Sequence, residues 1–390
     1  MEKKPESASR ESSHYAALGA SSSKEGVLTA LGTKAPTHFV EVSPDPDDPT
    51  EGSVLLHADG AGTKSVVAYL AYRETGDPTW FRGIAQDSLV MNLDDVAAVG
   101  CFRALLLSNT IGRNRRFVPD EVVAELINGY RASARVLDDQ GVKIQLAGGE
   151  TADLSDLVRT VVVDSTLSGR IKNSSLVTFA GAQIGDQIIG FSSTGRTRFE
   201  SKENSGIGSN GLTLARHALI PPELWKRYPE AKDPEGAPPL GAGSFLDFDA
   251  ELGMSLAEAI LSPTRSYAPI LKAITEEIPL SKIHGIVHCT GGGQTKIRRF
   301  LPHLRVVKNK LFSTPPLFQK IQRQGQIPWS EMYAVFNMGH RMELICSAEI
   351  AQPIIEIARR FDLAATVVGS VEAGSPEIII ESEHGVFAYQ

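Results

Sequence analysis

The sequence predicts a mixed α/β fold in two domains, and its length, its composition and the order of its elements support this. At roughly 150 residues per domain, 390 residues suffice for two domains. Hydrophobic residues make up 42% and charged residues 22%, as is ordinary for a chain that buries a core. Apolar strand patterns alternate with helical patterns on both sides of a polar connector at 172–185. We expect a disordered tail at 1–13 and domains at 14–172 and 185–390.

In the first domain, the polar stretch at 43–52 has three prolines and four acids, which predict an exposed loop. Strands are expected at 54–58, 143–147 and 160–167. A helix is expected at 86–99, where Gly100 would end it. A second helix is expected from Pro119 to about residue 138, because proline stands at its start and acids fill its first turn.

The second domain repeats the same mixture of elements. Its expected strands are 187–191, 283–289, 341–346 and 364–370. Its expected helices are 211–218, 266–277 and 349–361. Element boundaries drawn from periodicity carry an error of about 2–4 residues.

Composition excludes several classes of protein. The formal net charge is −7, and no basic stripe is present, so we expect no nucleic-acid partner. Three scattered cysteines without a CxxC pair indicate neither a disulfide framework nor a cysteine zinc site. The first 13 residues lack the apolar segment of a secretory signal, and no apolar run reaches the ~18 residues of a membrane span. We therefore expect a cytoplasmic protein without a membrane partner.

Three glycine-rich segments follow expected strands: DGAGTK at 59–64, LAGGETAD at 146–153 and HCTGGGQTK at 288–296. Glycines after a strand let backbone amides approach an anion, and a helix start adds a favourable dipole. In the first segment Asp59 is suited to a cation and Lys64 to phosphate. In the second, Glu150 follows two glycines and is suited to Mg²⁺. One such turn is usually ordinary loop structure, but three together favour a nucleotide-phosphate site.

The expected helix AQDSLVMNLDDVAAVG carries two polar stripes. Asp87 and Asp94 lie on one stripe, while Asn92 and Asp95 lie on another at i,i+3 spacing. Adjacent residues on a helix are about 100° apart, so Asp94 and Asp95 do not easily address one ion. Because the rest of the helix is apolar, we expect the Asn92 and Asp95 face to be half buried and to need a partner. The pair offers oxygen ligands of the kind that Mg²⁺ prefers.

Common nucleotide and hydrolase motifs do not fit. GAGTKS lacks the spacing of a Walker A loop. GIGSNG at 206–211 matches GxGxxG, but a polar segment precedes it where a dinucleotide fold needs a strand. No GxSxG or HExxH occurs. Cys289 is expected to be a buried structural cysteine.

The ordered set HADGAGTK, MNLDD, LAGGETAD, SGIGSNG, LSPTRSY, HCTGGG and WSEMYAVFNMG resembles the phosphoribosylformylglycinamidine cyclo-ligase (aminoimidazole ribonucleotide synthetase) family. The resemblance runs from about Tyr15 to the C-terminus. Within the wider synthetase superfamily, LSPTRSY and WSEMYAVFNMG are most similar to the cyclo-ligase. Selenophosphate synthetase would have a reactive cysteine near its N-terminus, whereas the first cysteine here is Cys101.

The resemblance implies an N-terminal domain that forms a β-barrel across a homodimer, and a C-terminal α/β domain. It implies ATP as co-substrate with Mg²⁺ at the dimer interface, and a ribonucleotide substrate between the domains. The implied ATP-binding residues are Asp59, Gly60, Gly62, Thr63, Lys64, Gly148, Gly149 and Glu150. The implied metal ligands are Asp59, Asp95 and Glu150, and the implied catalytic residues are Lys64 and Asp95. The implied substrate-contacting residues are Ser209, Asn210, Gly291, Gly292 and Gly293.

The implied reaction is the ATP-dependent ring closure of formylglycinamidine ribonucleotide to aminoimidazole ribonucleotide, in purine biosynthesis. Two departures from the family pattern stand out. Gly208 occupies the position of a histidine in SGxHSNG, and a polar insertion lies near 196–204. No glycine lies in 34–51, where family members have a glycine-rich stretch. A small-molecule kinase of the same superfamily and a catalytically silent ligand-binding relative are the alternative functions.

Overall fold

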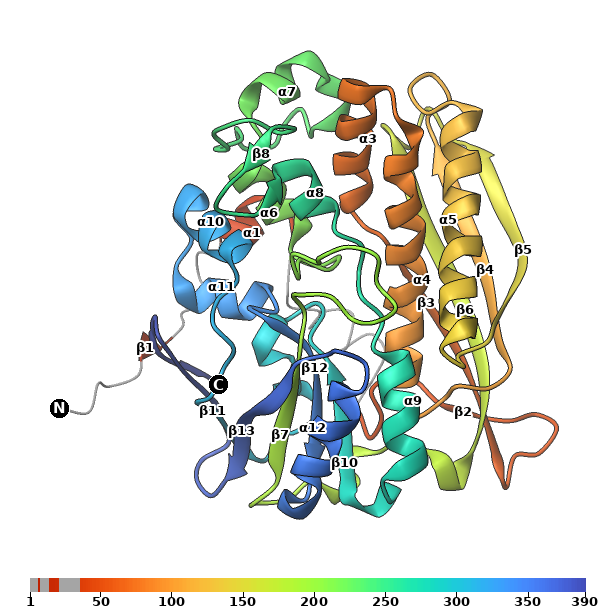
Figure 1. Cartoon of the computed structure of the whole chain (residues 1–390), viewed down its shortest axis with the longest axis vertical. Coiled ribbons are helices and arrows are strands. Elements are labelled where there is room, and N and C mark those ends of the chain that lie inside the picture. Colours follow the sequence, from red (N-terminus) through yellow and green to blue (C-terminus); the bar gives the residue numbers. More distant parts are fainter. Residues whose placement is uncertain (1–5, 8–13, 21–35) are drawn as a thin grey trace.

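The computed structural model describes residues 6–7, 14–20 and 36–390, and its strands form two large sheets (Figure 1). The first sheet has five strands in the order β2-β3-β6-β4-β5, all from the first 172 residues. The second has eight strands in the order β1-β15-β14-β11-β13-β7-β12-β10. None of the helices in the described part of the chain has the length and hydropathy that crossing a membrane requires.

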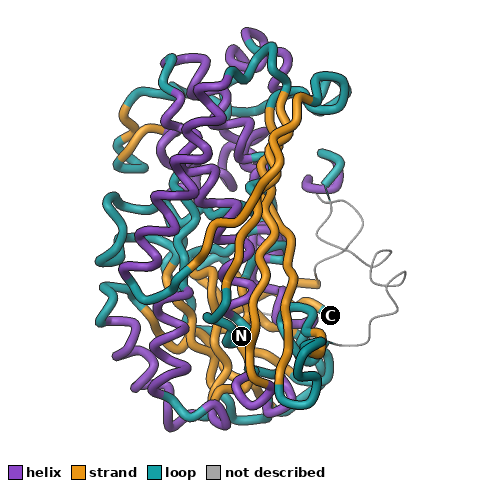
Figure 2. The backbone as a smooth tube through the Cα atoms, turned by 90° about the vertical axis from the view of Figure 1, so that its right-hand side faces the viewer, coloured by secondary structure: helices purple, strands orange, loops and turns teal. Residues whose placement is uncertain are grey.

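Within the described residues, the long helices of the first half of the chain cover one face of the five-stranded sheet. Its strands are β2 (Ser43–Pro44), β3 (Gly52–Gly60), β4 (Leu105–Arg113), β5 (Ile144–Asp153) and β6 (Val161–Lys172). Its helices are α3 (Lys64–Thr75), α4 (Arg82–Ala97) and α5 (Asp120–Asp139). Figure 2 shows these strands with the long helices on one side of them. Buried Val163 and Leu167 alternate with exposed Val162 and Asp164 along β6, as a sheet with one covered face requires.

Helices α4 and α5 differ in how much of their surface is buried, because they occupy different positions in the molecule. α5 is amphipathic: Val122, Leu126 and Tyr130 face the core, and Asp120 and Glu121 stand in its first turn. α4 packs against α5, β3 and β6 and also reaches α9 (Ala268–Glu277), so it is enclosed on every side. Every residue of α4 from Asp87 onward is buried. Its polar residues must therefore find protein partners.

The eight-stranded sheet is built mainly from the second half of the chain. Its strands are β1 (Glu6–Ser7), β7 (Gln187–Ser192), β10 (Ile283–His288), β11 (Arg305–Lys308), β12 (His340–Cys346), β13 (Ala365–Glu372), β14 (Ile378–Ser382) and β15 (Gly385–Tyr389). The remaining helices are α1 (His14–Ala17), α6 (Leu212–Leu219), α7 (Pro222–Arg227), α8 (Leu256–Leu261), α10 (Pro316–Gly325), α11 (Trp329–Val335) and α12 (Ala351–Arg359). A short hairpin pairs β8 (Phe248–Asp249) with β9 (Met254–Ser255).

The expected elements are present, mostly within a few residues of their predicted bounds, and three expectations need correction. LAGGETAD is not a turn: it lies inside β5, which pairs in parallel with β4. Residues 43–52 are not all loop, because β2 pairs with β3. The Asn92 and Asp95 face of α4 is fully rather than half buried. Much of the expected tail at 1–13 lies outside the described residues, and Glu6–Ser7 form β1 beside β15.

Candidate active site

The two polar stripes predicted on α4 face two different neighbours. The Asp87 and Asp94 stripe holds the LSPTRSY segment at 261–267, which links α8 to α9. The Asn92 and Asp95 stripe faces β3 and the end of β10. α4 therefore joins the two halves of the chain along its whole buried length.

Lys64, at the start of α3, is fully buried against Asp87. Its ammonium donates to Asp87 Oδ1 at 2.9 Å and to the carbonyl of Ser262 at 2.6 Å. Burial lowers the pKa of Lys64, although the charge of Asp87 opposes this. Asp87 also accepts hydrogen bonds from the amide and hydroxyl of Thr264, at 2.7 and 2.6 Å. These contacts make Lys64 part of the contact between the two halves of the chain.

Asp94 caps the start of α9. Its Oδ1 accepts from the Ser266 hydroxyl at 2.7 Å, and both of its oxygens accept from the Tyr267 amide at 3.0 Å. The amide of Ala268 adds a bond of 3.3 Å. Burial raises the pKa of Asp94, although positive charges such as Arg341 oppose this. Because these donors all belong to the start of α9, Asp94 attaches that helix to α4, which is a structural role.

Asp95, its neighbour in sequence, is held between two histidines from different halves of the chain. Its Oδ1 lies 2.6 Å from His288 Nδ1, at the end of β10, and its Oδ2 lies 3.2 Å from His57 Nε2, on β3. Burial alone would raise the pKa of Asp95, but the hydrogen bonds from His288 and His57 hold it well below its ordinary range. Asp95 is therefore an ionised carboxylate beside the DGAGTK turn.

Asn92 determines the protonation of His57. Its side-chain amide donates to the carbonyls of Asp59, Ser88 and Ser165 at 3.0 to 3.1 Å, so its Oδ1 must face His57 Nδ1, 3.1 Å away. Both ring nitrogens of His57 therefore face acceptors, which favours the imidazolium. Burial tends to lower the pKa of His57, but the hydrogen bond and charge of Asp95 outweigh it and the pKa is raised.

Asp59 is the second carboxylate at this place. Burial and the negative charge of Asp95 both raise its pKa, while the Gly60 amide, which donates to Oδ1 at 2.7 Å, opposes the shift. Two carboxylates that repel each other at the end of a strand fit a divalent cation, which would relieve the repulsion. Asp59 and Asp95 are thus near enough for the charge of one to shift the pKa of the other, and carboxylate oxygens are ligands of the kind that Mg²⁺ prefers.

Three of the predicted segments converge next to these carboxylates. In the DGAGTK turn, Gly62 lies near the Ser209 carbonyl, and the Thr63 hydroxyl is 3.3 Å from that of Thr213. Asn210 contacts Met91 on α4. A side chain at Gly291, which has φ +59°, would meet Asn210 Oδ1. The structure therefore brings Asp59, Gly60, Gly62, Thr63, Ser209, Asn210 and Gly291 to one region around α4.

Two groups of predicted site residues lie outside this region around α4 or have another explanation. Gly148, Gly149 and Glu150 are on β5, and Glu150 is separated from Gly60 by β4 and β6. Three strand spacings amount to about 14 Å, so one chain does not bring Glu150 to Asp59. Among the described residues, no three of His, Cys, Asp and Glu form a metal-binding group. Gly149 allows close strand pairing, because a Cβ there would lie 2.7 Å from Asn109 Oδ1.

The other glycines of TGGG have a packing role. Gly293 is buried with φ +49°, and a Cβ there would lie 2.5 Å from the Phe336 carbonyl and 2.6 Å from that of Tyr333. Gly292 has φ +129° and precedes the 3₁₀ helix Gly293–Arg299. A backbone with these angles favours glycine whether or not a ligand binds.

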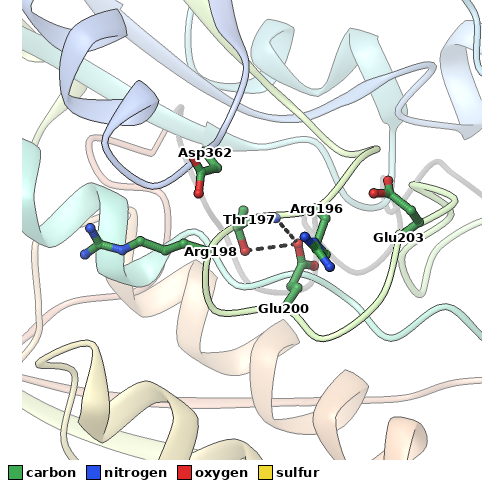
Figure 3. Close-up of a pocket in the computed structure, with 6 residues that line it drawn as sticks. All are labelled: Arg196, Thr197, Arg198, Glu200, Glu203 and Asp362. Atoms are coloured by element: carbon green, nitrogen blue, oxygen red, sulfur yellow. Dashed lines mark hydrogen bonds between the residues drawn. The ribbon is translucent and has the colours of Figure 1, made fainter.

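The polar insertion near 196–204 is anchored by an ion pair between a buried arginine and a partly buried glutamate. Arg265 Nη2, from LSPTRSY, lies 2.6 Å from Glu200 Oε2, which also accepts from the Thr197 amide and hydroxyl. Beside it is a polar pocket of about 410 Å³, drawn in Figure 3. The pocket is lined by Arg196, Thr197, Arg198, Glu200, Glu203 and Asp362. None of the predicted site residues lines this pocket.

Two family models match this chain in succession. The model described as AIR synthase related protein, N-terminal domain, covers residues 41–171, and the corresponding C-terminal domain covers residues 183–381. The chain belongs to the AIR synthase related protein family. The resemblance stated from the ordered motifs is thereby confirmed.

Curated relatives in this family carry the name phosphoribosylformylglycinamidine cyclo-ligase. The protein of Methanocaldococcus jannaschii is 29% identical over 322 residues, which cover 82% of this chain and 78% of the relative. That of Alkaliphilus metalliredigens is 28% identical over 342 residues, with 86% and 85% covered. That of Anaeromyxobacter dehalogenans is 30% identical over 334 residues, with 84% and 82% covered.

Solved structures of low identity share the fold of this AIR synthase related chain. AaThiL in complex with AMPPCP and TMP has a TM-score of 0.55 at 12% identity, over 94% of this chain and 95% of that one. A thiamine-monophosphate kinase from Stenotrophomonas maltophilia has a TM-score of 0.53 at 16% identity, over 88% and 92%. A T. maritima PurL in complex with FGAR has a TM-score of 0.54 at 16% identity. Our chain spans 47% of that PurL chain and is covered over 91% of its own length.

Sequence reasoning missed three members of the site: His57, His288 and Arg341. The sequence did indicate His57, because His57 and Asp59 are two residues apart on a strand and so point to the same face of the sheet. His288 is the last residue of β10, two positions before the TGGG segment, at the strand end where site residues gather. No sequence signal marked Arg341, whose Nε donates to His288 Nε2 at 3.3 Å.

Proposed function

We propose that this protein catalyses the ATP-dependent ring closure of formylglycinamidine ribonucleotide to aminoimidazole ribonucleotide. Membership of the AIR synthase related protein family and the names of the curated relatives support this reaction. The observation that carries the proposal is the meeting of Asp59 and Asp95 with the SNG and TGGG turns around α4. Charged groups and glycine turns in one place are suited to hold a triphosphate beside a ribonucleotide.

ATP is the proposed co-substrate, with Mg²⁺ held by Asp59 and Asp95. Bound there, Mg²⁺ would neutralise phosphate charge during phosphoryl transfer. The partly buried His57 side chain lies on β3 two residues before Asp59 and contacts Asp95, which outweighs the effect of burial, raises the pKa of His57 and favours its charged form. Lys64, Gly60, Gly62 and Thr63 stay proposed ATP-site residues, and so do Gly148, Gly149 and Glu150.

The proposed chemistry begins with activation of a poor leaving group. The formamide oxygen of the substrate attacks the γ-phosphorus of ATP, ADP leaves and an iminophosphate forms. The amidine nitrogen then attacks the activated carbon and loses a proton, and phosphate departs with the formyl oxygen. The protein's contribution is to orient the two ends of one molecule, which is worth several kcal/mol in favourable cases. Ser209, Asn210 and the Gly291–Gly293 turn are the proposed substrate contacts.

A homodimer belongs to the same proposal. The face of the five-stranded sheet opposite its helices exposes apolar side chains: Leu56 is 75% exposed, Leu106 42% and Val162 43%. Apolar groups on an open sheet face favour association with another sheet. We propose that two copies pair these faces as a barrel, with the ATP sites at the interface, and that the enzyme works in the cytoplasm. Its proposed parts are an N-terminal ATP-binding domain at 14–172 and a C-terminal domain at 185–390.

The test is product analysis with purified protein, formylglycinamidine ribonucleotide and Mg-ATP. We expect ADP and phosphate in equal amounts together with aminoimidazole ribonucleotide. With ¹⁸O in the formyl group, the label should appear in the released phosphate. A phosphorylated product that accumulates without ring closure would identify a kinase instead. No ADP release with this ribonucleotide would contradict the proposed function, and unlabelled phosphate would contradict the iminophosphate route.

A further inference from the structure

Lys296 follows the TGGG turn closely in sequence and lies near Asp95 in space. Its ammonium donates to the Thr290 carbonyl at 2.6 Å and lies 4.9 Å from the ring centre of Phe39. Thr290 is two residues after His288, whose Nδ1 is 2.6 Å from Asp95 Oδ1. The ammonium of Lys296 is therefore fixed at the end of β10, close to the residues that hold Asp95.

The charge of Lys296 acts on both carboxylates of the site. Burial and the charge of Asp95 raise the pKa of Asp59, and the positive charge of Lys296 is one of the influences that oppose this shift. At Asp95, burial is outweighed by the hydrogen bonds from His288 and His57, and the charge of Lys296 adds to the lowering of the pKa. Charge effects weaken with distance, so a cation that acts on both acids lies near both. Lys296 thus brings positive charge to the place where Asp59 and Asp95 concentrate negative charge.

The glycines beside Lys296 leave the backbone open to a ligand. A Cβ at Gly292 would lie 3.4 Å from Lys296 Cβ, so this glycine packs against the stem of the lysine. Gly291 is exposed, and a Cβ there would lie 3.7 Å from Asn210 Oδ1. Neither glycine carries a side chain that would keep a ligand from the peptide groups beside the ammonium. The turn therefore brings together backbone amides, an asparagine and a cation, which are groups that bind phosphoryl oxygens in proteins.

Lys296 and Lys64 differ in what surrounds their ammonium groups. Lys64 is fully buried and ion-paired with Asp87 at 2.9 Å. Lys296 is partly exposed, and its hydrogen bond to Thr290 is to a neutral carbonyl. An ammonium has three N–H donors, so it can bind this carbonyl and a phosphoryl oxygen at the same time. Lys296 thus combines a fixed ammonium with access to solvent.

We propose that Lys296 binds a phosphoryl group held at the Asp59 and Asp95 site. The triphosphate of ATP and the phosphate of the ribonucleotide both present suitable oxygens, and separate titrations distinguish these two sources. The identity of the ligands rests on the proposed function, whereas binding by Lys296 is measured without turnover. Because an ammonium is a compact charge, Lys296 neutralises part of the phosphoryl charge and holds one oxygen in place.

The test is isothermal titration calorimetry of the full-length protein with a non-hydrolysable ATP analogue plus Mg²⁺ and, separately, with formylglycinamidine ribonucleotide. In Lys296→Met we expect the Kd of one ligand to rise about 10- to 100-fold, because a hydrogen bond between charged groups is lost. A rise for the ATP analogue assigns the triphosphate to Lys296, and a rise for the ribonucleotide assigns its phosphate. Lys296→Arg keeps the charge and should restore part of the affinity. Unchanged Kd values, or an equal rise for both ligands, would overturn the proposal.

The matched control is Arg298→Met. Arg298 is on the same 3₁₀ helix as Lys296, and its Nη1 donates to the Pro302 carbonyl at 3.1 Å. Its loss therefore also removes a cation that is bonded to a backbone carbonyl. This variant should leave both Kd values unchanged, and urea titration checks that each variant is folded. Equal losses of affinity in Lys296→Met and Arg298→Met would show a structural effect and overturn the proposal.

Ring closure is measured separately, so that the two proposals can fail independently. A wild type that binds the ATP analogue but forms no aminoimidazole ribonucleotide would contradict the proposed function, and the Kd values of the variants would still decide the role of Lys296. A wild type that closes the ring, with unchanged Kd values in Lys296→Met, would contradict the role of Lys296 and not the function. A wild type that binds neither ligand would contradict both.

Discussion

Asp94 and Asp95 are adjacent on α4 and similarly buried, yet they have different partners. Asp94 accepts hydrogen bonds from the Ser266 hydroxyl and from two backbone amides at the start of α9. Asp95 is bonded to two histidine rings from distant parts of the chain. The difference arises because a 100° step around a buried helix turns one carboxylate to a helix start and the other to the DGAGTK turn. Burial alone therefore does not identify a functional acid; the donors that surround it do.

The pKa shifts of the two carboxylates follow the same division. Burial dominates at Asp94 and raises its pKa, whereas at Asp95 the hydrogen bonds from His288 and His57 overcome burial and lower it. Asp95 also lies near a second carboxylate, Asp59, whose pKa is raised by burial and by this neighbour. Asp95 thus belongs to a charged site, and Asp94 to a structural joint between two halves of the chain.

The largest expected effect is the loss of turnover in Asp95→Asn. The amide keeps the shape of the side chain but removes the negative charge that the site needs for Mg²⁺. We expect ADP release to fall by at least about 100-fold, of the order seen when a group that stabilises transition-state charge is removed. A coupled assay for ADP measures this, and near-normal turnover at ordinary Mg²⁺ would discard the assignment.

Asp94→Asn should chiefly affect stability. The amide group would face the Tyr267 N–H, whose hydrogen bonds go to the two Asp94 oxygens, and the Ala268 N–H, which also reaches the Ser266 hydroxyl. Unsatisfied buried donors cost roughly 1–3 kcal/mol each. We expect the free energy of unfolding to fall by about 3 kcal/mol, measured by urea titration with circular dichroism. An unchanged midpoint would contradict the structural role of Asp94.

Lys64→Met should also lower stability, because it leaves Asp87 buried without its cation. Breaking a buried ion pair by removing one partner typically costs about 3–5 kcal/mol, but the Thr264 bonds that remain on Asp87 place our expectation near the lower figure. The matched control is Lys272→Met, which breaks a more exposed pair with Glu276 and should cost less than about 1 kcal/mol. A raised KM for ATP in Lys64→Met without loss of stability would instead support a direct contact with phosphate.

The smallest expected effect is the pH dependence of the stability that His57 contributes to the fold. Because the folded-state pKa of His57 lies above its ordinary value of 6.5, the stability that it contributes is fully present below that value. The contribution is lost as the pH rises through the folded-state pKa. The stability difference between wild type and His57→Gln should therefore be larger at about pH 6 than at about pH 9. Urea midpoints at both pH values test this, and the reverse order would show that His57 is not held as a cation.

The regular elements were accessible from the sequence because their periodicity is local. α5 and β7 lie within about one residue of prediction, since their apolar spacing and terminal residues indicate them directly. β5 was misread at LAGGETAD, because paired glycines resemble a turn when the partner strand is not visible. Gly149 leaves room for Asn109 of β4, and this contact joins residues that are 40 positions apart in the sequence.

The site could be predicted only in part. The stripes of α4 follow from helix geometry, and so did the proximity of Asn92 and Asp95. The partners of Asp95 could not be derived, because His57 and His288 are separated from it by 38 and 193 positions and are brought near only by tertiary packing. The motif around Lys64 predicts a contact with phosphate, and no local pattern indicates its buried hydrogen bonds to Asp87 and Ser262, which come from tertiary packing.

The most direct test of the division of roles on α4 is turnover per folded molecule in Asp94→Asn and Asp95→Asn. Both variants are assayed with formylglycinamidine ribonucleotide and Mg-ATP at a temperature where circular dichroism reports each as folded. We predict near wild-type ring closure in Asp94→Asn and a loss of at least about 100-fold in Asp95→Asn. Equal losses in the two variants, or a greater loss in Asp94→Asn, would contradict the division.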